Sequence, residues 1–101
     1  MAVKTIPWDP AEHLRTPEDV VGYLQAAFED GDPKVIAAAL GDVARARGMT
    51  SLAKDTGLSR EALYRPLSSD GNPELSTVLK VLNAYGLRLE AKPVEPRKSA
   101  A

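Results

Sequence analysis

Apolar residues recur along the middle of the chain at the spacing of helical faces, and capping residues followed by proline mark where the runs begin. Thr16-Pro17 and Asp32-Pro33 both have this form, which is favoured at the first turn of a helix. Gly31 and Gly48 stand at the ends of the two runs, where glycine readily adopts the backbone conformation that terminates a helix. The pattern therefore predicts two consecutive helices that end at these glycines.

Two further proline signals predict helices nearer the ends of the chain. Asp9-Pro10 predicts a short helix through Leu14, and Asn72-Pro73 predicts a last helix that stops at Gly86. The last helix has apolar residues at the i, i+3, i+4 and i+7 positions of one face, which we expect to be buried: Leu75, Val78, Leu79 and Leu82.

Residues 49–68 read MTSLAKDTGLSREALYRPLS and contain two short helical runs that meet at a Gly-Leu-Ser junction. Thr50 is predicted to cap the first run, Gly57 to end it in the left-handed conformation, and Ser59 to cap the second. This spacing is typical of a helix-turn-helix, whose second helix presents its first residues to base edges in the major groove. A structural helical hairpin with the same small-residue corner is the alternative.

The outward-facing residues of this segment favour DNA binding. Arg60 can donate paired hydrogen bonds to guanine, and four residues can hold phosphates, namely Thr50, Ser51, Ser59 and Tyr64. Four basic residues add non-specific attraction to a polyanion: Arg45, Arg47, Lys54 and Arg65. The predicted DNA-binding set is Thr50, Ser51, Lys54, Ser59, Arg60, Glu61, Tyr64 and Arg65.

Pro66 lies where the second helix of this pair should still be running. Proline removes one backbone hydrogen bond and clashes with the carbonyl of Ala62, at a cost of about 3 kcal/mol in a helix interior. It also disfavours the helical conformation at Arg65. We therefore predict a second helix that is short, kinked or ended near Arg65, with its base-reading residues ahead of the proline.

After Gly86 the pattern changes to a strict alternation of apolar and charged residues, LRLEAK, which predicts a strand with one buried face at residues 87–92. The chain offers no strong partner strand, with Val3 to Ile6 as a weak candidate, and a lone strand leaves backbone donors and acceptors unpaired. We therefore expect Leu87, Leu89 and Ala91 to pair with a second copy across a two-fold axis, giving a homodimer. The chain then divides into an N-terminal arm (1–15), a helical domain (16–86), a dimerising strand (87–93) and a disordered tail (94–101).

Composition narrows the class of protein. The 101 residues are 44% apolar and 27% charged, which is typical of one globular domain. Cysteine is absent, which excludes disulfides and thiolate metal sites, and a single histidine, His13, makes a poor metal site. We find no signal-peptide core, membrane-spanning run, phosphate loop or activated serine in the sequence, so we expect a cytoplasmic protein that is not an enzyme and uses no cofactor.

Charge is unevenly distributed along the chain. Residues 1–33 carry seven acidic and two basic residues, a net charge of −5, whereas residues 34–101 carry eleven basic and seven acidic residues, a net charge of +4. Such asymmetry can serve two different partners, and the alternative is a mixed solvated surface.

A resemblance to a known family is carried by the run RARGMTSLAKDTGLSREALYRPLSSDGNPELSTVLKVLNAYGLRLEAKP, with its motifs GMT, TGLSRE, GNP and GLRL. Together with the upstream segments WDPAEHL and GDPKVIAAALGDVARARG, it resembles the small HigA-like antidote proteins of bacterial addiction modules over residues 6–93. The resemblance implies a mostly α, lambda-repressor-like bundle of about five helices that represses its own operon as a dimer. The sequence departs from the family pattern at Ser51, Ala62 and Pro66, and the first two departures indicate a different operator or fewer contacts.

The resemblance also implies a RelE/ParE-type toxin as partner, a small basic protein similar to ribonucleases. A protein that grips RNA phosphates should carry a basic groove, which the acidic residues 1–33 are suited to cover. Tight binding needs apolar anchors, and we expect Ile6, Trp8 and Leu14 of the arm to supply them. The competing interpretation is that this region packs on the helical core.

The hypothesis drawn from the sequence is an antitoxin that neutralises its toxin and represses its own operon by binding operator DNA. A phage-type regulator without a toxin is one alternative. A structural helical protein whose hairpin never meets DNA is the other.

Overall fold

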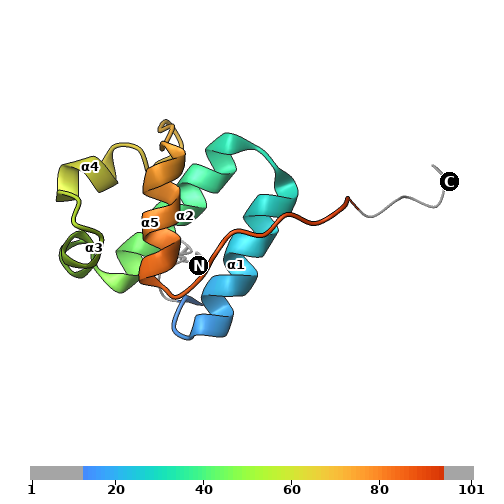
Figure 1. Cartoon of the computed structure of the whole chain (residues 1–101), viewed down its shortest axis with the longest axis horizontal. Helices are drawn as coiled ribbons and strands as arrows, with labels where there is room; N and C mark the ends of the chain where they lie inside the picture. Colours follow the sequence, from blue (N-terminus) through green and yellow to red (C-terminus); the bar gives the residue numbers. More distant parts are fainter. Residues whose placement is uncertain (1–12, 95–101) are drawn as a thin grey trace, which may run out of the picture.

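Helices follow one another through the part of the chain that the computed structural model describes, residues 13–94 (Figure 1). They are α1 (Pro17–Asp30), α2 (Pro33–Arg47), α3 (Met49–Thr56), α4 (Arg60–Tyr64) and α5 (Leu75–Ala84). α1 packs against α2, α5 packs against α2 and α3, and α3 and α4 lie together at one end of the molecule (Figure 1). The predicted mostly α helical bundle is confirmed.

Local hydrogen bonds explain why α1 and α2 begin where they do. Thr16 Oγ1 accepts a hydrogen bond from the backbone N–H of Asp19 (3.1 Å), and the Asp19 carboxylate accepts one from the backbone N–H of Thr16 (3.2 Å). The backbone N–H groups of Arg15 and Thr16 lower the pKa of Asp19, because they stabilise its ionised form. Asp32 caps α2 by accepting from the N–H of Lys34 (2.9 Å), so both predicted starts are confirmed.

The end of α5 is set by Gly86, whose positive φ of 75° suits glycine. The N–H of Leu87 donates to the Leu82 carbonyl and the N–H of Gly86 donates to the Asn83 carbonyl, each over 2.9 Å, which is the Schellman pattern of helix termination. Gly31, with φ of 81°, ends α1 in the left-handed conformation. Both predicted stops are confirmed.

Two predicted helix starts are wrong. α3 begins at Met49, directly after Gly48, so Thr50 lies inside its first turn and is not its N-cap. The N-cap of α5 is Glu74, two residues later than the predicted Asn72. Neither helix has a side-chain cap, so we attribute both starts to the packing of the helices rather than to a local hydrogen bond.

The core draws side chains from every helix. Val20, Leu24 and Ala27 are the buried residues of α1. The largest side chains with under 2% exposure come from α2, α3, α4, the segment after α4, and α5: Leu40, Val43, Leu52, Leu63, Leu67 and Val81. Burial of these apolar groups is the main stabilising contribution to such a fold.

α5 buries a different face from the predicted one. Val81 (0% exposed) and Leu82 (2%) are buried and Val78 is partly buried, whereas Leu75 and Leu79 are 63% and 43% exposed. The prediction was therefore wrong for Leu75 and Leu79. Apolar residues cover a wide arc of this helix, and the position of α2 and α3 decides which part of the arc is covered.

Two tyrosine hydroxyls attach neighbouring helices to α2. Tyr85, just after α5, donates to the backbone carbonyl of Val43, and Tyr23 of α1 donates to the carboxylate of Asp42 over 2.6 Å. Burial raises the pKa of Tyr85 to about 12, and burial together with the hydrogen bond to Asp42 raises the pKa of Tyr23 to about 12. Both hydroxyls therefore stay protonated, and able to donate, well above neutral pH.

The C-terminal segment does not form the predicted strand. Residues 87–94 have no regular secondary structure in the described part of the chain, and they run outward past α1 (Figure 1). Leu87 packs against the core, Leu89 is 40% exposed and Ala91 is exposed, so the three do not share one buried face. A strand requires a partner strand for its backbone groups, and the helices of the described region offer none. Apart from Val94, the predicted tail (94–101) lies outside the described residues.

None of the helices within residues 13–94 combines the length and the apolar composition that crossing a membrane requires.

Candidate nucleic-acid interface

α3 and α4 are joined by a turn of three residues, 57–59, which hydrogen bonds hold in place. Gly57 ends α3 with a φ of 79°, as predicted. Thr56 Oγ1 donates to the Leu52 carbonyl (2.8 Å) and accepts from the backbone N–H of Leu58 (3.2 Å). Leu58 packs against the core and fills the corner between the helices. The sequence reasoning missed the role of Thr56, although a threonine next to a terminating glycine is a signal for such bonds.

α4 is a single short helix whose boundaries agree with the prediction. Ser59 Oγ accepts a hydrogen bond from the N–H of Ala62 (3.0 Å), so the predicted cap is confirmed. The helix ends at Tyr64, and Arg65 closes it by donating to the Glu61 carbonyl over 3.3 Å. Pro66 follows at once, and its missing N–H explains why the helix does not continue.

The inner side of α4 is buried, and the segment after it rests on α2. Leu63 and Leu67 are 0% and 1% exposed, as their spacing predicted. Gly41 of α2 lies against the backbone of Leu67, so closely that a Cβ at Gly41 would stand 2.1 Å from the Leu67 carbonyl oxygen. The sequence reasoning missed this contact. A glycine on the buried side of a helix is the only signal that could have indicated it.

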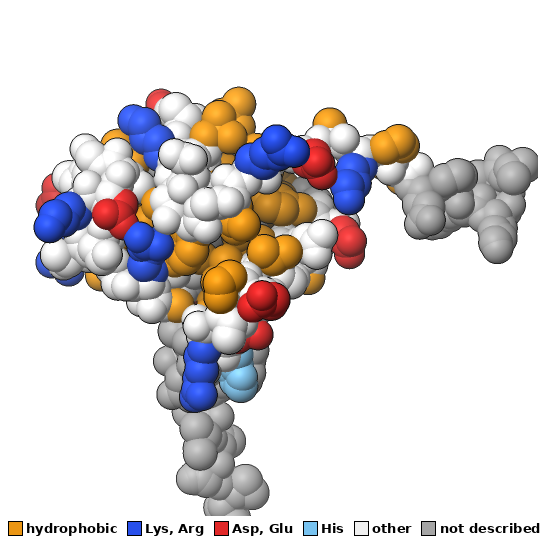
Figure 2. Space-filling model, turned by 60° about the horizontal axis from the view of Figure 1, so that its bottom comes forward, with side chains coloured by type: hydrophobic (Ala, Val, Ile, Leu, Met, Phe, Trp, Pro, Cys, Tyr) orange, Lys and Arg blue, Asp and Glu red, His pale blue; other side chains and the backbone are white. Residues whose placement is uncertain are grey.

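All the residues predicted to bind DNA are exposed. They lie on α3, on the turn, on α4 and directly after α4: Thr50, Ser51, Lys54, Ser59, Arg60, Glu61, Tyr64 and Arg65. Figure 2 shows several lysine and arginine side chains at the end of the molecule that carries α3 and α4 in Figure 1. The structure therefore brings the predicted set together on one end of the molecule, with its polar groups accessible to a partner.

Two of the arginines that were predicted to attract phosphates have partners within the protein. Arg45 forms an ion pair with Asp42 on α2, and Arg47 forms one with Asp55 on α3. The Arg47 guanidinium also lies over the ring of Tyr85, 5.1 Å from its centroid. The contacts of Arg47 link α2 to α3 and to the residue that follows α5, whereas the Arg45 pair lies within α2. Both arginines are partly neutralised, so we no longer count either as a free cation.

Lys54 and Arg65 differ from these arginines, because neither forms an ion pair with another residue of the described chain, 13–94. Arg60 contacts Tyr64 of the same helix, with its Cζ atom 5.8 Å from the ring centroid. Three exposed cations therefore remain on α3, on α4 and directly after α4. Together they can donate hydrogen bonds to an anion or to the acceptor edge of a base.

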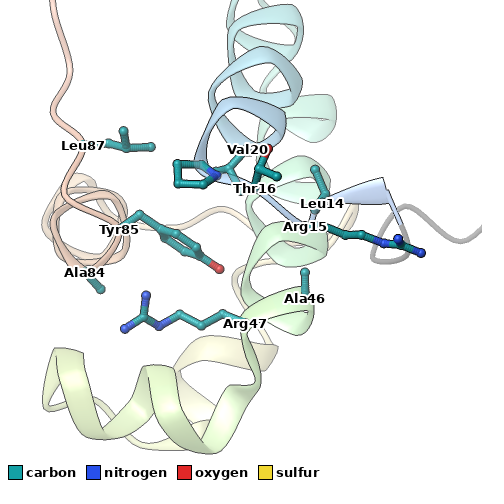
Figure 3. A pocket seen from close by; sticks show the side chains of 10 residues that line it. Leu14, Arg15, Thr16, Val20, Ala46, Arg47, Ala84, Tyr85 and Leu87 are labelled. Atoms are coloured by element: carbon teal, nitrogen blue, oxygen red, sulfur yellow. The ribbon is translucent and has the colours of Figure 1, made fainter.

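A cavity of about 330 Å³ lies away from this end, between the start of α1, the end of α2 and the end of α5 (Figure 3). It is lined by Leu14, Arg15, Thr16, Pro17, Val20, Ala46, Arg47, Ala84, Tyr85 and Leu87. Arg47 extends beneath the ring of Tyr85, so one wall of the cavity contains the arginine that pairs with α3 (Figure 3). The lining is mostly apolar and includes no acidic side chain.

The residues predicted to anchor a toxin are only partly described. Leu14 is 9% exposed and packs in the core, as the competing interpretation expected, so its side chain is not accessible to a partner in this structure. A lone apolar residue before a helix start gives no periodicity from which its burial could have been predicted. Ile6, Trp8 and most of the predicted helix from Asp9 to Leu14 lie outside the described residues, as does most of the predicted arm (1–15).

Among residues 13–94 we find no group of three or more histidine, aspartate or glutamate side chains that could hold a metal ion.

Comparisons with known proteins bear on this arrangement. Residues 4–93 match a family model described as a probable addiction module antidote protein. A protein of Haemophilus influenzae, described as an uncharacterized protein, is 44% identical over 85 residues, which cover 84% of this chain and 88% of that relative. No solved structure matches the chain.

Proposed function

The chain belongs to the family of probable addiction module antidote proteins, and we propose on that basis that it is the antitoxin of a type II toxin–antitoxin module. The observation that carries the proposal is the extent of the family match, since residues 4–93 include every helix described here. An antidote implies a toxin partner. We propose that this partner is a RelE/ParE-type toxin, and that the antitoxin also represses its own operon by binding operator DNA.

The α3–α4 end supports the DNA-binding part of this proposal, because its exposed polar residues stand on a buried framework. Leu52 and Leu63 are both 0% exposed, so neither helix can shift without disturbing the core. An α-helix with its side chains is about 10–12 Å in diameter and the major groove is about 12 Å wide, so a helix such as α4 can enter it. Arg60 then stands in the first turn, where a recognition helix contacts bases.

We expect the substitution Arg60→Ala to weaken operator binding by about 1–3 kcal/mol and to relax the preference at one base pair. The matched control is Lys54→Ala, which removes a cation that we assign to a phosphate and should weaken binding to all sequences alike. Fluorescence anisotropy measures both effects, on the promoter of the protein's own operon and on a set of single-base variants of it. Wild-type affinity and preference in Arg60→Ala would show that α4 does not read bases.

The negative charge of the N-terminal third of the chain supports a basic partner for it. Residues 1–33 have a net charge of −5, and Glu18, Glu29 and Asp30 of α1 are exposed. Complementary charge speeds encounter with a basic toxin but contributes little affinity by itself. Because Leu14 is buried, the apolar anchors that we propose are Ile6 and Trp8, which lie outside the described residues.

In the full chain, Trp8→Ala should weaken toxin binding by at least about 2 kcal/mol, the loss typical of a buried aromatic anchor, while operator binding stays unchanged. Calorimetry against the co-encoded toxin measures the first effect and anisotropy against the operator the second. A chain that begins at His13 tests the whole segment and, unlike one that begins later, keeps Leu14 in the core. Undiminished toxin binding by both variants would exclude residues 1–12 as the neutralising element.

We further propose that the protein binds its operator as a homodimer. A two-fold axis would set two recognition helices about 34–36 Å apart, as successive major grooves of a palindromic site require. Residues 87–92, including the exposed Leu89, have no strand partner within residues 13–94, and we propose that a second copy supplies one. Sedimentation equilibrium with and without operator DNA measures the number of copies bound.

A further inference from the structure

Arg60 and Tyr64 form a pair on the exposed side of α4. They are four residues apart, one helical turn, and the Cζ atom of Arg60 lies 5.8 Å from the centroid of the Tyr64 ring. This distance is within the range in which the electron-rich face of an aromatic ring attracts a cation, about 6 Å. Tyr64 is 45% exposed and Arg60 is exposed, so the pair is not part of the core.

The two members of the pair differ in how firmly they are held. Tyr64 lies between Leu63, which is 0% exposed, and Arg65, whose N–H donates to the Glu61 carbonyl, so its backbone is fixed by the core and by the end of the helix. A tyrosine ring has only two side-chain torsions. Arg60 has a long flexible side chain, and within residues 13–94 it forms no ion pair that would restrict it. The ring therefore has fewer torsions to restrict than the guanidinium.

We propose that Tyr64 is a positioning residue, whose ring holds the Arg60 guanidinium in place for reading a base. The inference rests on the proposed DNA-binding function and assigns the ring a role different from that of the hydroxyl. A guanidinium restrained before contact loses less conformational freedom when it forms paired hydrogen bonds to a base. The ring therefore contributes to discrimination at the base pair that Arg60 reads, whereas the hydroxyl contributes to contact with a phosphate, which carries no sequence information.

Two substitutions separate these roles. Tyr64→Phe removes the hydroxyl and keeps the ring, and Tyr64→Leu removes both while keeping an apolar side chain that favours helices. We expect Tyr64→Phe to weaken binding to all DNA sequences alike and to keep the base preference. Tyr64→Leu should in addition lower discrimination at the base pair read by Arg60 by about 2- to 5-fold, the strength of a cation–aromatic contact at an exposed site.

The double variant Arg60→Ala/Tyr64→Leu provides the test of coupling. If the ring acts through Arg60, replacing Tyr64 with leucine in the Arg60→Ala background causes no further loss of discrimination. A ring that only stabilised α4 would instead lower affinity for every sequence and would lower the free energy of unfolding, which thermal unfolding measures. Loss of discrimination in Tyr64→Phe equal to that in Tyr64→Leu would overturn the proposal, as would full discrimination in Tyr64→Leu.

The contact between Arg60 and the Tyr64 ring can also be measured without DNA. Side-chain NMR signals of Arg60 should carry the ring-current shift of Tyr64, keep it in Tyr64→Phe and lose it in Tyr64→Leu. Arg60 signals that are the same in all three proteins would overturn the inference, whatever the DNA-binding measurements show.

If the wild type does not distinguish its own promoter from unrelated DNA, the proposed DNA-binding function fails and the positioning role fails with it. If the wild type prefers its own promoter and Tyr64→Leu keeps the same base preference, only the positioning role is overturned.

Discussion

The substitution Gly41→Ala is expected to lower the free energy of unfolding by about 1–3 kcal/mol, the usual range for an overpacked core. A methyl group at this position would stand 2.1 Å from the carbonyl oxygen of Leu67 and 3.1 Å from its carbonyl carbon. Both atoms belong to the backbone, so no side-chain rotation can relieve the contact. Alanine favours a helix over glycine by about 1 kcal/mol, which only partly offsets the steric cost.

Gly22→Ala is the matched control, because Gly22 is also inside a helix, α1, but has no atom within 4 Å of the position of a Cβ. It should raise the free energy of unfolding by up to about 1 kcal/mol. Chemical denaturation of the two variants measures both changes. Gly41→Ala should also weaken operator binding, since moving Leu67 displaces the segment that follows α4. An equally stabilising effect of both substitutions would show that α2 and Leu67 are farther apart than described here.

Leu82→Ala is expected to lower the free energy of unfolding by about 2–5 kcal/mol, as truncation of a buried leucine usually does. Leu82 is 2% exposed and its neighbour Val81 is fully buried, so the truncated side chain leaves a cavity that the surrounding helices can fill only in part. At this size, a loss of that magnitude approaches the whole stability of a small domain. Thermal unfolding should therefore show a large decrease in Tm.

The control for this prediction lies on the same helix. Leu75 is 63% exposed, and Leu75→Ala should change the free energy of unfolding by less than about 0.5 kcal/mol. The two substitutions remove the same atoms, so the difference between them measures burial alone. Comparable losses for both would mean that α5 buries the face marked by its apolar spacing, and that the orientation of α5 described here is wrong.

Much of the α3–turn–α4 segment could be predicted because its signals are local. The cap at Ser59, the left-handed Gly57 and the helix end before Pro66 all depend on residues within a turn or two of one another. The outward Arg60 and Tyr64 and the buried Leu63 and Leu67 agree with the faces predicted from their spacing. Short-range signals and spacing were enough for these features.

The errors fell where distant parts of the chain meet. Thr50 was predicted to cap α3, yet the cap is Gly48, two residues earlier, which also ends α2. Leu14 was predicted to be an anchor, yet it is buried in the core. Alternation predicted a strand at residues 87–92, but a strand needs a partner backbone that the described helices do not supply.

The sequence by itself determined the mostly α class, most helix ends and the pair of short helices α3 and α4, since caps, glycine stops and proline breaks are set by hydrogen bonds and torsions within a few residues. Only the tertiary structure decided which face of α5 is buried, that Gly41 lies against Leu67, and that Arg47 is committed to Asp55 and Tyr85. These facts depend on which surfaces lie opposite one another after folding. Short-range signals carry no information about these contacts, because the residues that meet are far apart in the sequence.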